Sequence, residues 1–420
     1  MATLETATAG EDASKAPVAG AQVDGLTPQG PSVHQSTPRE LLVRKLIDIV
    51  VLPPARISSN ERALTGDVLL QIIDKVEESL RIEIARRVAR VPEAPPALLR
   101  MLLLGEPAVA KPIIQHAHHL PEAILIEAAR EGKTAHREMI ARRQDLTTAI
   151  ADVLVAVNEP EVAKTLLKRE EFTLSPSSID ILVSRSTQDK DLQALLLRRR
   201  ELEPAHGFMM FWWVDAERRR RILARFALDR GIIQDALADL YPRTFRGPNP
   251  DPFVKEILIL LERRHRPRGV NGEAVSMDVV KRTLMAARTH AAQEIVYAVA
   301  MVAGVSRELA ARILRDAGGE AYAVMCKSLG ISRDDFFQLV TSGEPAACPT
   351  FEPKRADEVL AVFDTMARDF SRAVLRYWDW DGNPRIASIT RLLGIDEDVK
   401  FERRSGRDRR ARARLGQADG

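Results

Sequence analysis

From Leu41 onward, apolar residues recur three and four positions apart, with polar and charged residues between them. The stretch LLQIIDKVEESLRIEIARRVARV has this spacing, which places its apolar side chains on one face of an α-helix. A β-strand would need alternating apolar residues, rich in β-branched types and bounded by tight turns, and the sequence has no convincing run of that kind. The pattern therefore predicts an all-α protein.

Two sets of short motifs return at regular distances in the first half of the chain. IARRVARV begins at Ile84, IARRQDL at Ile140 and LLRRREL at Leu196, which gives a spacing of 56 residues. The second set, EPAVAKPII, EPEVAKTLL and DAERRRRIL, follows in the same order. A period of this length holds about four short helices, so we take the unit to be a helix pair of about 28 residues. Stacked pairs predict an α-solenoid, in which each unit buries its apolar face against its neighbours.

An aromatic segment, GFMMFWWV, directly precedes DAERRRR in the third copy. Its apolar run is far shorter than the roughly 20 residues of a membrane-spanning helix, so no membrane span is predicted. The 56-residue register aligns this run with 153–157, which predicts buried packing residues that include Trp212 and Trp213. An aromatic stacking platform is the alternative. The same register places Arg218 and Arg219 at apolar positions, as an end unit of the array would show.

The second half of the chain also has helical patterning. GVSRELAARIL and GISRDDFFQLV begin at Gly304 and Gly330, where the glycine suits the end of one helix and the serine the start of the next. The segments PRTFRGPNPDP and TSGEPAACPTFEP mark boundaries because they are rich in helix-breaking residues. We predict a disordered leader over 1–40, a helical-repeat domain over 41–241, a second helical-repeat region over 251–345, a long helix and a short C-terminal helix over 353–395, and an arginine-rich tail over 400–420.

The long helix is predicted over residues 354–378. Its apolar residues lie three and four positions apart in a heptad pattern. They are Leu360, Phe363, Ala367, Phe370, Val374 and Tyr377. We expect this helix to pack lengthwise on its own domain, and a homodimer contact through 354–378 is the alternative.

Composition and charge narrow the range of partners. Hydrophobic residues make up 45% of the 420 residues, aromatic residues 5% and charged residues 29%, which suits a helical protein. The formal net charge is only +3 and the excess positive charge lies in the tail, so no overall field points to nucleic acid. Cys326 and Cys348 form no C-x-x-C motif and no secretory leader is found, which favours reduced thiols in a cytoplasmic protein.

Motifs for catalysis or cofactor binding are not found in the sequence. It has no phosphate-binding glycine loop, nucleophile elbow or H-E-x-x-H zinc motif. The histidines of HAHHLPE (His116, His118 and His119), with His136 beyond them, do not share one helix face as zinc ligands would. We therefore predict a non-enzymatic protein with no metal and no cofactor.

Arginine pairs at the repeat positions are the strongest candidates for a binding surface. The second member of each pair, Arg87, Arg143 or Arg199, borders the predicted buried face, and the first points outward. The pairs predict either a structural ladder that pairs with carboxylates such as Asp145 and Glu201, or a basic stripe for an acidic peptide or a phosphate backbone. The candidate binding residues are Arg86, Arg142, Arg198, Arg218, Arg221, Arg403, Arg404, Arg407, Arg409 and Arg410.

Three stretches carry a resemblance to a known family. HREMIARRQDLTTAIADVLV, the EPEVAKTLL that follows it, and CKSLGISRDDFFQLV further on are similar to an alphaproteobacterial family described as a domain of unknown function. The resemblance covers about residues 60–340 and implies a bacterial source and helical repeats of the HEAT type. It implies no catalytic residues.

On these grounds we expect a cytoplasmic helical-repeat protein that binds another protein, as a scaffold or a regulator. The alternative is a nucleic-acid-binding protein that uses the arginine ladder and the basic tail. An enzyme with an unrecognised site ranks below both.

Overall fold

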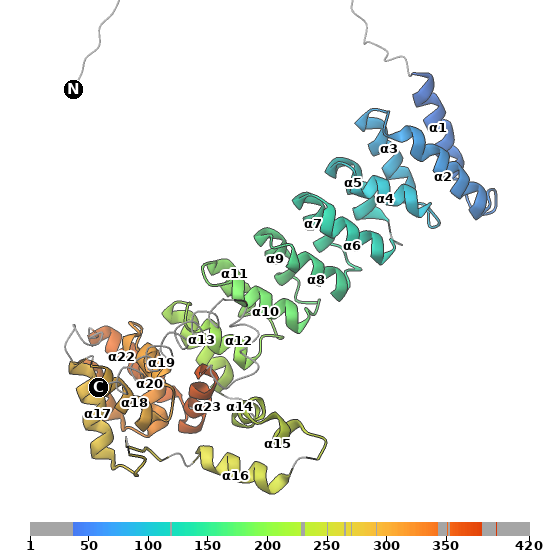
Figure 1. The fold of residues 1–420 in the computed structure, drawn as a ribbon. Helices are drawn as coiled ribbons and strands as arrows, with labels where there is room; N and C mark the ends of the chain where they lie inside the picture. Colours follow the sequence, from blue (N-terminus) through green and yellow to red (C-terminus); the bar gives the residue numbers. More distant parts are fainter. Residues whose placement is uncertain are drawn as a thin grey trace, which may run out of the picture.

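The computed structural model describes residues 37–117, 120–227, 232–249, 251–263, 266–269, 271–290, 292–342, 351, 353–379 and 392. Within these residues the chain forms twenty-three α-helices and no β-strand, which confirms the predicted all-α class. The helices form an elongated solenoid and a more compact region at its C-terminal end (Figure 1). The predicted tail, the short C-terminal helix except for Leu392, and all but the last residues of the predicted leader lie outside the described residues.

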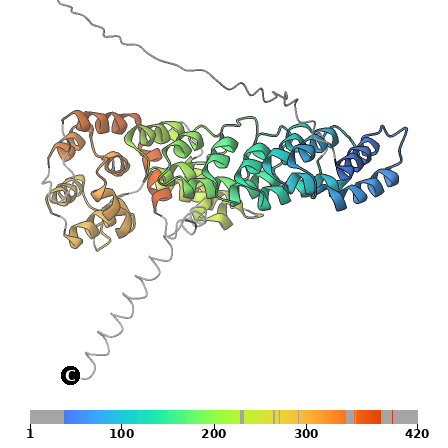
Figure 2. The same ribbon diagram turned by 90° about the horizontal axis from the view of Figure 1, so that it is seen from above.

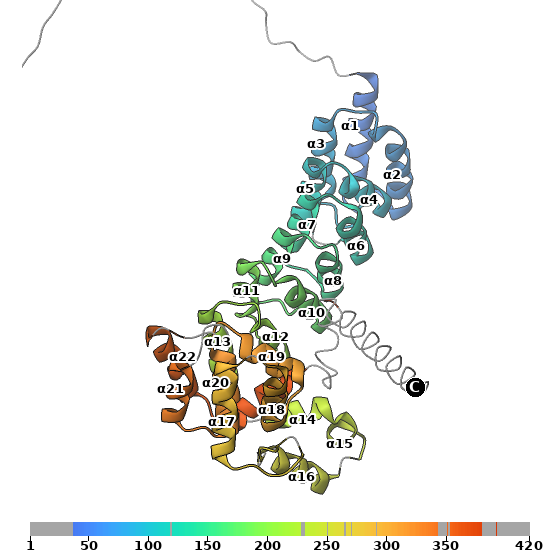
Figure 3. The ribbon, with the colours of Figure 1, turned by 60° about the vertical axis from the view of Figure 1, so that its left-hand side comes forward.

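The first thirteen helices form the solenoid. They are α1 (Pro38–Val50), α2 (Ser59–Ile73), α3 (Glu78–Val88), α4 (Pro96–Leu104), α5 (Pro107–His116), α6 (Glu122–Glu131), α7 (Thr134–Ala141), α8 (Thr148–Ala156), α9 (Pro160–Leu167), α10 (Pro176–Arg185), α11 (Lys190–Leu196), α12 (Pro204–Met210) and α13 (Ala216–Ala227). The odd-numbered helices α1 to α11 contact one another in order along one layer, and the even-numbered helices α2 to α12 do so along the other (Figures 1 and 3). Internal pairs are therefore covered by a neighbour on both sides, as in a stacked solenoid.

Proline and capping residues determine where the helices of the solenoid begin. Proline is the first residue of α4, α5, α9, α10 and α12, where its missing N–H costs no hydrogen bond. The side chains of Thr37, Ser58 and Ser175 each accept a hydrogen bond from the third backbone N–H of the helix that follows. Because Thr37 caps α1, that helix begins at Pro38, inside the stretch predicted as leader.

The helices recur at the predicted spacing. α3, α7 and α11 begin at Glu78, Thr134 and Lys190, which are 56 residues apart in each step. α8 and α12 begin at Thr148 and Pro204, again 56 residues apart. The apolar spacing is similar in each copy, so the same local pattern gives the same element at the same position.

The aromatic segment of the third copy lies mostly in the core. Residues 208–211 are buried, as predicted, but α12 ends at Met210, so the run forms a helix end and a turn. Trp212 and Trp213 follow in this turn and are only half-buried. The indole N–H of Trp213 donates to the hydroxyl of Ser186 at 3.1 Å. No helix among the described residues combines the length and the apolarity needed to cross a bilayer.

The C-terminal region is built around one buried helix. Its helices are α14 (Ile232–Leu240), α15 (Pro242–Arg246), α16 (Pro252–Arg263), α17 (Met277–Thr289), α18 (Gln293–Ala303), α19 (Arg307–Arg315), α20 (Glu320–Leu329), α21 (Arg333–Thr341), α22 (Pro353–Thr365) and α23 (Arg368–Trp378). α20 is almost entirely buried and contacts α18, α19, α22 and α23. α23 also contacts α12 and α14, so it links this region to the end of the solenoid (Figure 2).

The two predicted glycine–serine junctions form as expected. Gly304 and Gly330 end α18 and α20 in the left-handed conformation, with φ of 63° and 81°. A residue with a Cβ would be strained there. The side chains of Ser306 and Ser332 then accept a backbone hydrogen bond at the start of α19 and α21.

The single long helix predicted over 354–378 is instead two helices. α22 ends at Thr365 and α23 begins at Arg368, with Ala367 in an extended conformation between them. The break allows α22 to pack on α20 and α21 while α23 turns toward α12 and α14. One straight helix would leave one of these sets of neighbours uncovered.

Five of the six residues of this apolar seam are buried inside the same chain, and Ala367, at the break between the two helices, is exposed. Leu360, Phe363, Val374 and Tyr377 are all buried. Phe363 stacks on Phe336 of α21, with ring centroids 4.4 Å apart. The expectation that the seam packs on its own domain is therefore confirmed for these five residues, which leaves no continuous exposed seam for the alternative of a homodimer contact through 354–378.

Candidate functional site

The inward arginine of the second repeat pair binds the end of a neighbouring helix. Arg143 donates hydrogen bonds to the carbonyls of Ile114 and Ala117 at the end of α5, the second at 2.9 Å. Its guanidinium also bonds the carboxylate of Asp145. The last carbonyls of a helix have no donor within the helix, so a cation placed there satisfies them and opposes the negative end of the helix dipole.

Three further arginines repeat this arrangement along the solenoid. Arg169 donates to the carbonyl of Arg143 at 2.6 Å, and Arg199 donates to that of Arg169 at 2.6 Å. Arg225 donates to the carbonyl of Arg199 at 2.8 Å. We call Arg143, Arg169, Arg199 and Arg225 the inner ladder. Each of its members holds the C-terminal end of the preceding helix of the same layer.

The contacts of the inner ladder favour the structural interpretation of Arg143 and Arg199. Its guanidinium groups are used on backbone carbonyls and on nearby carboxylates, including the predicted Asp145 and Glu201. Arg169 was not predicted, although it shares with Arg143 and Arg199 an acidic residue two positions later. Arg87, in the first copy, differs because its guanidinium pairs with Asp48 at 2.6 Å and is one-third exposed.

The outward arginines lie on the surface of the solenoid. Arg86, Arg142 and Arg198 are all exposed, as predicted. Arg142 forms an ion pair with Glu138 one turn earlier at 3.3 Å and borders a surface cavity of about 500 Å³. The three therefore remain accessible, but they do not converge on one site.

The remaining candidate arginines divide between the surface and the undescribed tail. Arg218 is half-buried and bonds Asp215 and the carbonyl of Lys190. Arg221 is exposed and pairs with Glu217 at 2.5 Å, one turn away on α13. The tail members lie outside the described residues; they are Arg403, Arg404, Arg407, Arg409 and Arg410.

Arg219 is the cation that joins the solenoid to the C-terminal region. Its Nη1 donates to both carboxylate oxygens of Asp316 at 2.9 Å and to the carboxylate of Glu320 at 3.2 Å. Its Nε donates to the carbonyl of Phe211 at 3.0 Å. Arg355 of α22 bonds Glu320 from the other side. Two arginines thus compensate two buried carboxylates, which would be costly to bury alone.

An aromatic cluster packs beside these charges, where the end of the solenoid meets the C-terminal region. We call this contact the joint. The indole N–H of Trp378 in α23 donates to the carbonyl of Phe208 at 2.9 Å. Its ring lies 4.7 Å from that of Phe211 and 4.9 Å from that of Trp212, measured between centroids. The enlarged apolar segment of the third copy therefore serves as the surface on which α23 docks, which explains why this copy carries aromatic residues.

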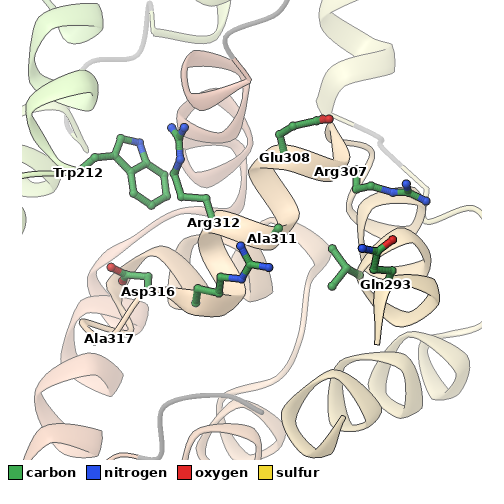
Figure 4. Close-up of a pocket in the computed structure, with 10 residues that line it drawn as sticks. Trp212, Gln293, Arg307, Glu308, Ala311, Arg312, Asp316 and Ala317 are labelled. Carbon is green, nitrogen blue, oxygen red and sulfur yellow. The ribbon is translucent and has the colours of Figure 1, made fainter. Parts of the chain in front are cut away.

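A pocket of about 780 Å³ opens beside the joint, between the turn after α12 and helices α18 and α19 (Figure 4). Trp212 forms one wall, and Arg307, Arg312 and Arg315 of α19 contribute the basic groups. Trp212 and Gln293 lie at opposite ends of the pocket (Figure 4). The other lining residues are Val296, Glu308, Ala311, Asp316 and Ala317.

Two of the three cations of the pocket are held against aromatic rings. The guanidinium carbon of Arg312 lies 5.2 Å from the centroid of Trp212, and that of Arg307 lies 5.1 Å from the centroid of Tyr297. Burial lowers the pKa of Arg312 to about 10, because desolvation disfavours the charged form. Arg312 remains protonated at neutral pH, so the pocket keeps its positive character.

An exposed apolar stripe runs along α16. The stripe consists of Phe253, Val254, Ile257, Leu260 and Leu261. These positions follow Phe253 by one, four, seven and eight residues, which places them on one face of the helix. Phe253 is 68% exposed and Leu261 is 64% exposed, whereas Leu258 and Ile259 pack against the core. The signal is present in the segment FVKEILILL, which lies near the start of the helical-repeat region predicted over 251–345.

Two of the histidines that the structure describes, His136 and His206, serve helix starts, whereas His116 and His290 lie at the ends of α5 and α17. His136 Nδ1 accepts a hydrogen bond from the backbone N–H of Lys133, and its Nε2 donates to the carbonyl of Gly105, both at 3.0 Å. Burial lowers the pKa of His136 because it disfavours the charged ring. His206 caps the start of α12 in the same way. Over the described ranges no cluster of three or more histidine, cysteine or acidic side chains could hold a metal, and the second and third histidines of HAHHLPE lie outside those ranges.

These features define an all-helical protein in which a solenoid is joined to a compact helical region by buried ionic and aromatic contacts. The chain belongs to a bacterial family described as an uncharacterised protein conserved in bacteria (DUF2336), whose family model matches residues 109–376. The match begins in α5 and ends in α23, so it includes the pocket and the ionic contact of Arg219 with Asp316, while Trp378 lies just beyond it. No curated protein matches the chain, and no solved structure matches it.

Proposed function

We propose that the protein is a non-enzymatic helical-repeat scaffold or regulator that binds another protein, and that the apolar stripe on α16 receives a helix of that partner. The observation that carries the proposal is the exposure of five large apolar side chains on one helix face. Single exposed apolar residues are ordinary on protein surfaces, whereas a contiguous apolar patch marks an interaction site. The spacing is that of an amphipathic helix that packs against a second helix.

Burial of this stripe would supply a useful part of the binding free energy. A fully buried Leu, Ile or Phe side chain is stabilised by about 1.5–3 kcal/mol relative to an exposed one. α16 already contacts α14, α15 and α23 through its other face, so the stripe is presented on a supported helix. We further propose that the stacked helix pairs are of the HEAT type, that the source is alphaproteobacterial and that the protein acts in the cytoplasm.

Nucleic-acid binding, the alternative function, has less support. It would use the arginine ladder. In the inner ladder, however, the guanidinium groups already donate hydrogen bonds to backbone carbonyls. Within the arginine pairs, the outward members, such as Arg86 and Arg198, keep exposed cations on the solenoid. They are spread over separate repeats rather than gathered on one surface, which suits phosphate recognition less well.

Affinity capture from the source bacterium, with and without nuclease treatment, tests both functions. The full chain would be compared with a Phe253→Glu/Leu261→Glu variant, which places charge on the stripe, and with a Glu256→Gln control, which changes an exposed residue at the edge of the stripe without adding charge. We expect a protein that is retained after nuclease by the full chain and by the control, and lost from the stripe variant. If nuclease treatment abolishes capture, and the stripe variant captures as much as the full chain without nuclease, nucleic-acid binding is favoured instead.

A further inference from the structure

We infer that the pocket at the joint binds a nucleoside phosphate, with the planar base against the Trp212 end and the phosphates against Arg307 and Arg315. The pocket volume of about 780 Å³ lies within the usual range for small-molecule sites. It is separate from the stripe on α16, so this inference does not depend on the proposed scaffold function.

Charge in the pocket selects an anion. Arg307, Arg312 and Arg315 lie on α19 within about two turns of helix, and all three line the pocket. Of the two acidic lining residues, Asp316 already accepts hydrogen bonds from Arg219 and from the backbone N–H of Gly319. The lining therefore carries three cations against two carboxylates, one of which already binds Arg219. An arginine guanidinium matches the geometry of phosphate oxygens and binds them through paired hydrogen bonds.

The aromatic end of the pocket selects a planar ring. The Trp212 indole is fixed from behind by Phe211 and Trp378, so it is a rigid surface rather than a mobile one. Arg312 lies over that indole and offers a second planar group on which a base can stack. Gln293, at the opposite end, can both donate and accept a hydrogen bond.

Two arginines of the pocket, Arg307 and Arg312, are already held in position before a ligand binds. Arg307 is positioned over Tyr297, and Arg312 over Trp212, so both lose less side-chain freedom on binding than an unrestrained surface arginine would. Burial lowers the pKa of Arg312 to about 10. An anion bound beside it would offset part of the desolvation that causes this shift.

Isothermal titration of the full chain with ATP and GTP tests the inference, with adenosine and inorganic triphosphate as the two halves of the ligand. We expect saturable binding of at least one nucleotide, and binding weaker by at least about tenfold for adenosine and for triphosphate alone. The Arg307→Gln/Arg315→Gln variant changes only exposed side chains and should weaken nucleotide binding by at least about tenfold. Arg221→Gln, an exposed arginine on α13 outside the pocket, is the matched control and should bind like the unchanged chain.

Two outcomes would overturn the inference. One is the absence of saturable nucleotide binding by a chain whose helical circular dichroism and melting are intact. The other is binding that the Arg307→Gln/Arg315→Gln variant retains in full. If triphosphate binds as tightly as ATP, the assignment of Trp212 as the surface on which the base stacks is wrong. In that case Trp212→Phe, which keeps a smaller aromatic ring, should have no effect on the affinity for ATP.

Discussion

Arg219 and Asp316 are 97 residues apart in the sequence, yet the Nη1 atom of Arg219 lies 2.9 Å from both carboxylate oxygens of Asp316. The contact connects α13 of the solenoid to the residue that ends α19. Glu320 shares the same guanidinium and is fully buried. The orientation of the two parts of the molecule, and with it the shape of the pocket between them, depends on this group of charges.

Replacing Arg219 by alanine should therefore destabilise the protein strongly. The change leaves Asp316 and Glu320 with less compensating charge in a buried site, for which the expected cost is about 3–5 kcal/mol. Chemical denaturation followed by circular dichroism would measure the free energy of unfolding. Arg221→Ala, two residues away on the exposed side of α13, should stay within about 0.5 kcal/mol of the unchanged chain. Equal effects of the two changes would contradict the role assigned to Arg219.

A similar prediction follows for Arg199 of the inner ladder and for its exposed neighbour Arg198. Arg199 is buried and donates to the carbonyls of Arg169 and Phe172, so Arg199→Ala should cost about 3 kcal/mol. Arg198→Ala removes an exposed cation and should cost no more than about 0.5 kcal/mol. The same denaturation measurement applies, and a costly Arg198 change with a neutral Arg199 change would reverse the assignment of the two faces.

A substitution in the aromatic cluster at the joint should lower the free energy of unfolding about as much as the change at Arg219. Trp378 is buried, packs on two aromatic rings and donates to the carbonyl of Phe208, so Trp378→Ala should cost about 3–5 kcal/mol. Hydrogen exchange should show the loss of protection first in α12 and α23, which meet at this residue. Tyr241→Ala, at an exposed aromatic residue, serves as the control and should leave both stability and exchange unchanged. Uniform loss of protection along the whole solenoid would contradict a local joint.

Stability should fall as the pH drops below about 6.5, with a contribution from His136. Its pKa in the folded chain is lowered from the ordinary value of 6.5, so the unfolded chain takes up a proton that the folded chain resists. This contribution is present in full above pH 6.5 and is lost as the pH falls toward the lower pKa of the folded state. Denaturation between about pH 7 and pH 5 should show a flatter pH dependence for His136→Gln. His116→Gln, at an exposed histidine, is the matched control.

Cys326 should be inert in the folded protein. It is fully buried in α20, and burial raises its pKa to about 12, so almost no thiolate exists at neutral pH. In a Cys348→Ser variant, which isolates this thiol, Ellman's reagent should not react until denaturant is added. Reaction of the native variant at the rate of a free thiol would show that α20 opens readily and is not the buried centre of the C-terminal region.

Sequence by itself determined the elements and the stacking of the solenoid. The three-and-four spacing of apolar residues sets which face of each helix is buried, and the 56-residue period repeats that face, so helix positions and layers follow from local pattern alone. The same reasoning separated the inward from the outward member of each arginine pair. It anticipated the carboxylates of Asp145 and Glu201 as partners of Arg143 and Arg199. It did not reveal their other partners, because these are backbone carbonyls at the ends of other helices, which no side-chain motif marks.

Only the tertiary structure decided the joint, the pocket and the break between α22 and α23. Each depends on contacts between residues far apart in the chain, such as Arg219 with Asp316 or Trp378 with Phe208, and local spacing contains no record of such pairs. The heptad spacing over 354–378 was compatible with one helix, but the chain bends because α22 and α23 cover different neighbours. The stripe on α16 has the apolar pattern of a core helix, and only the arrangement of the surrounding helices leaves that face exposed.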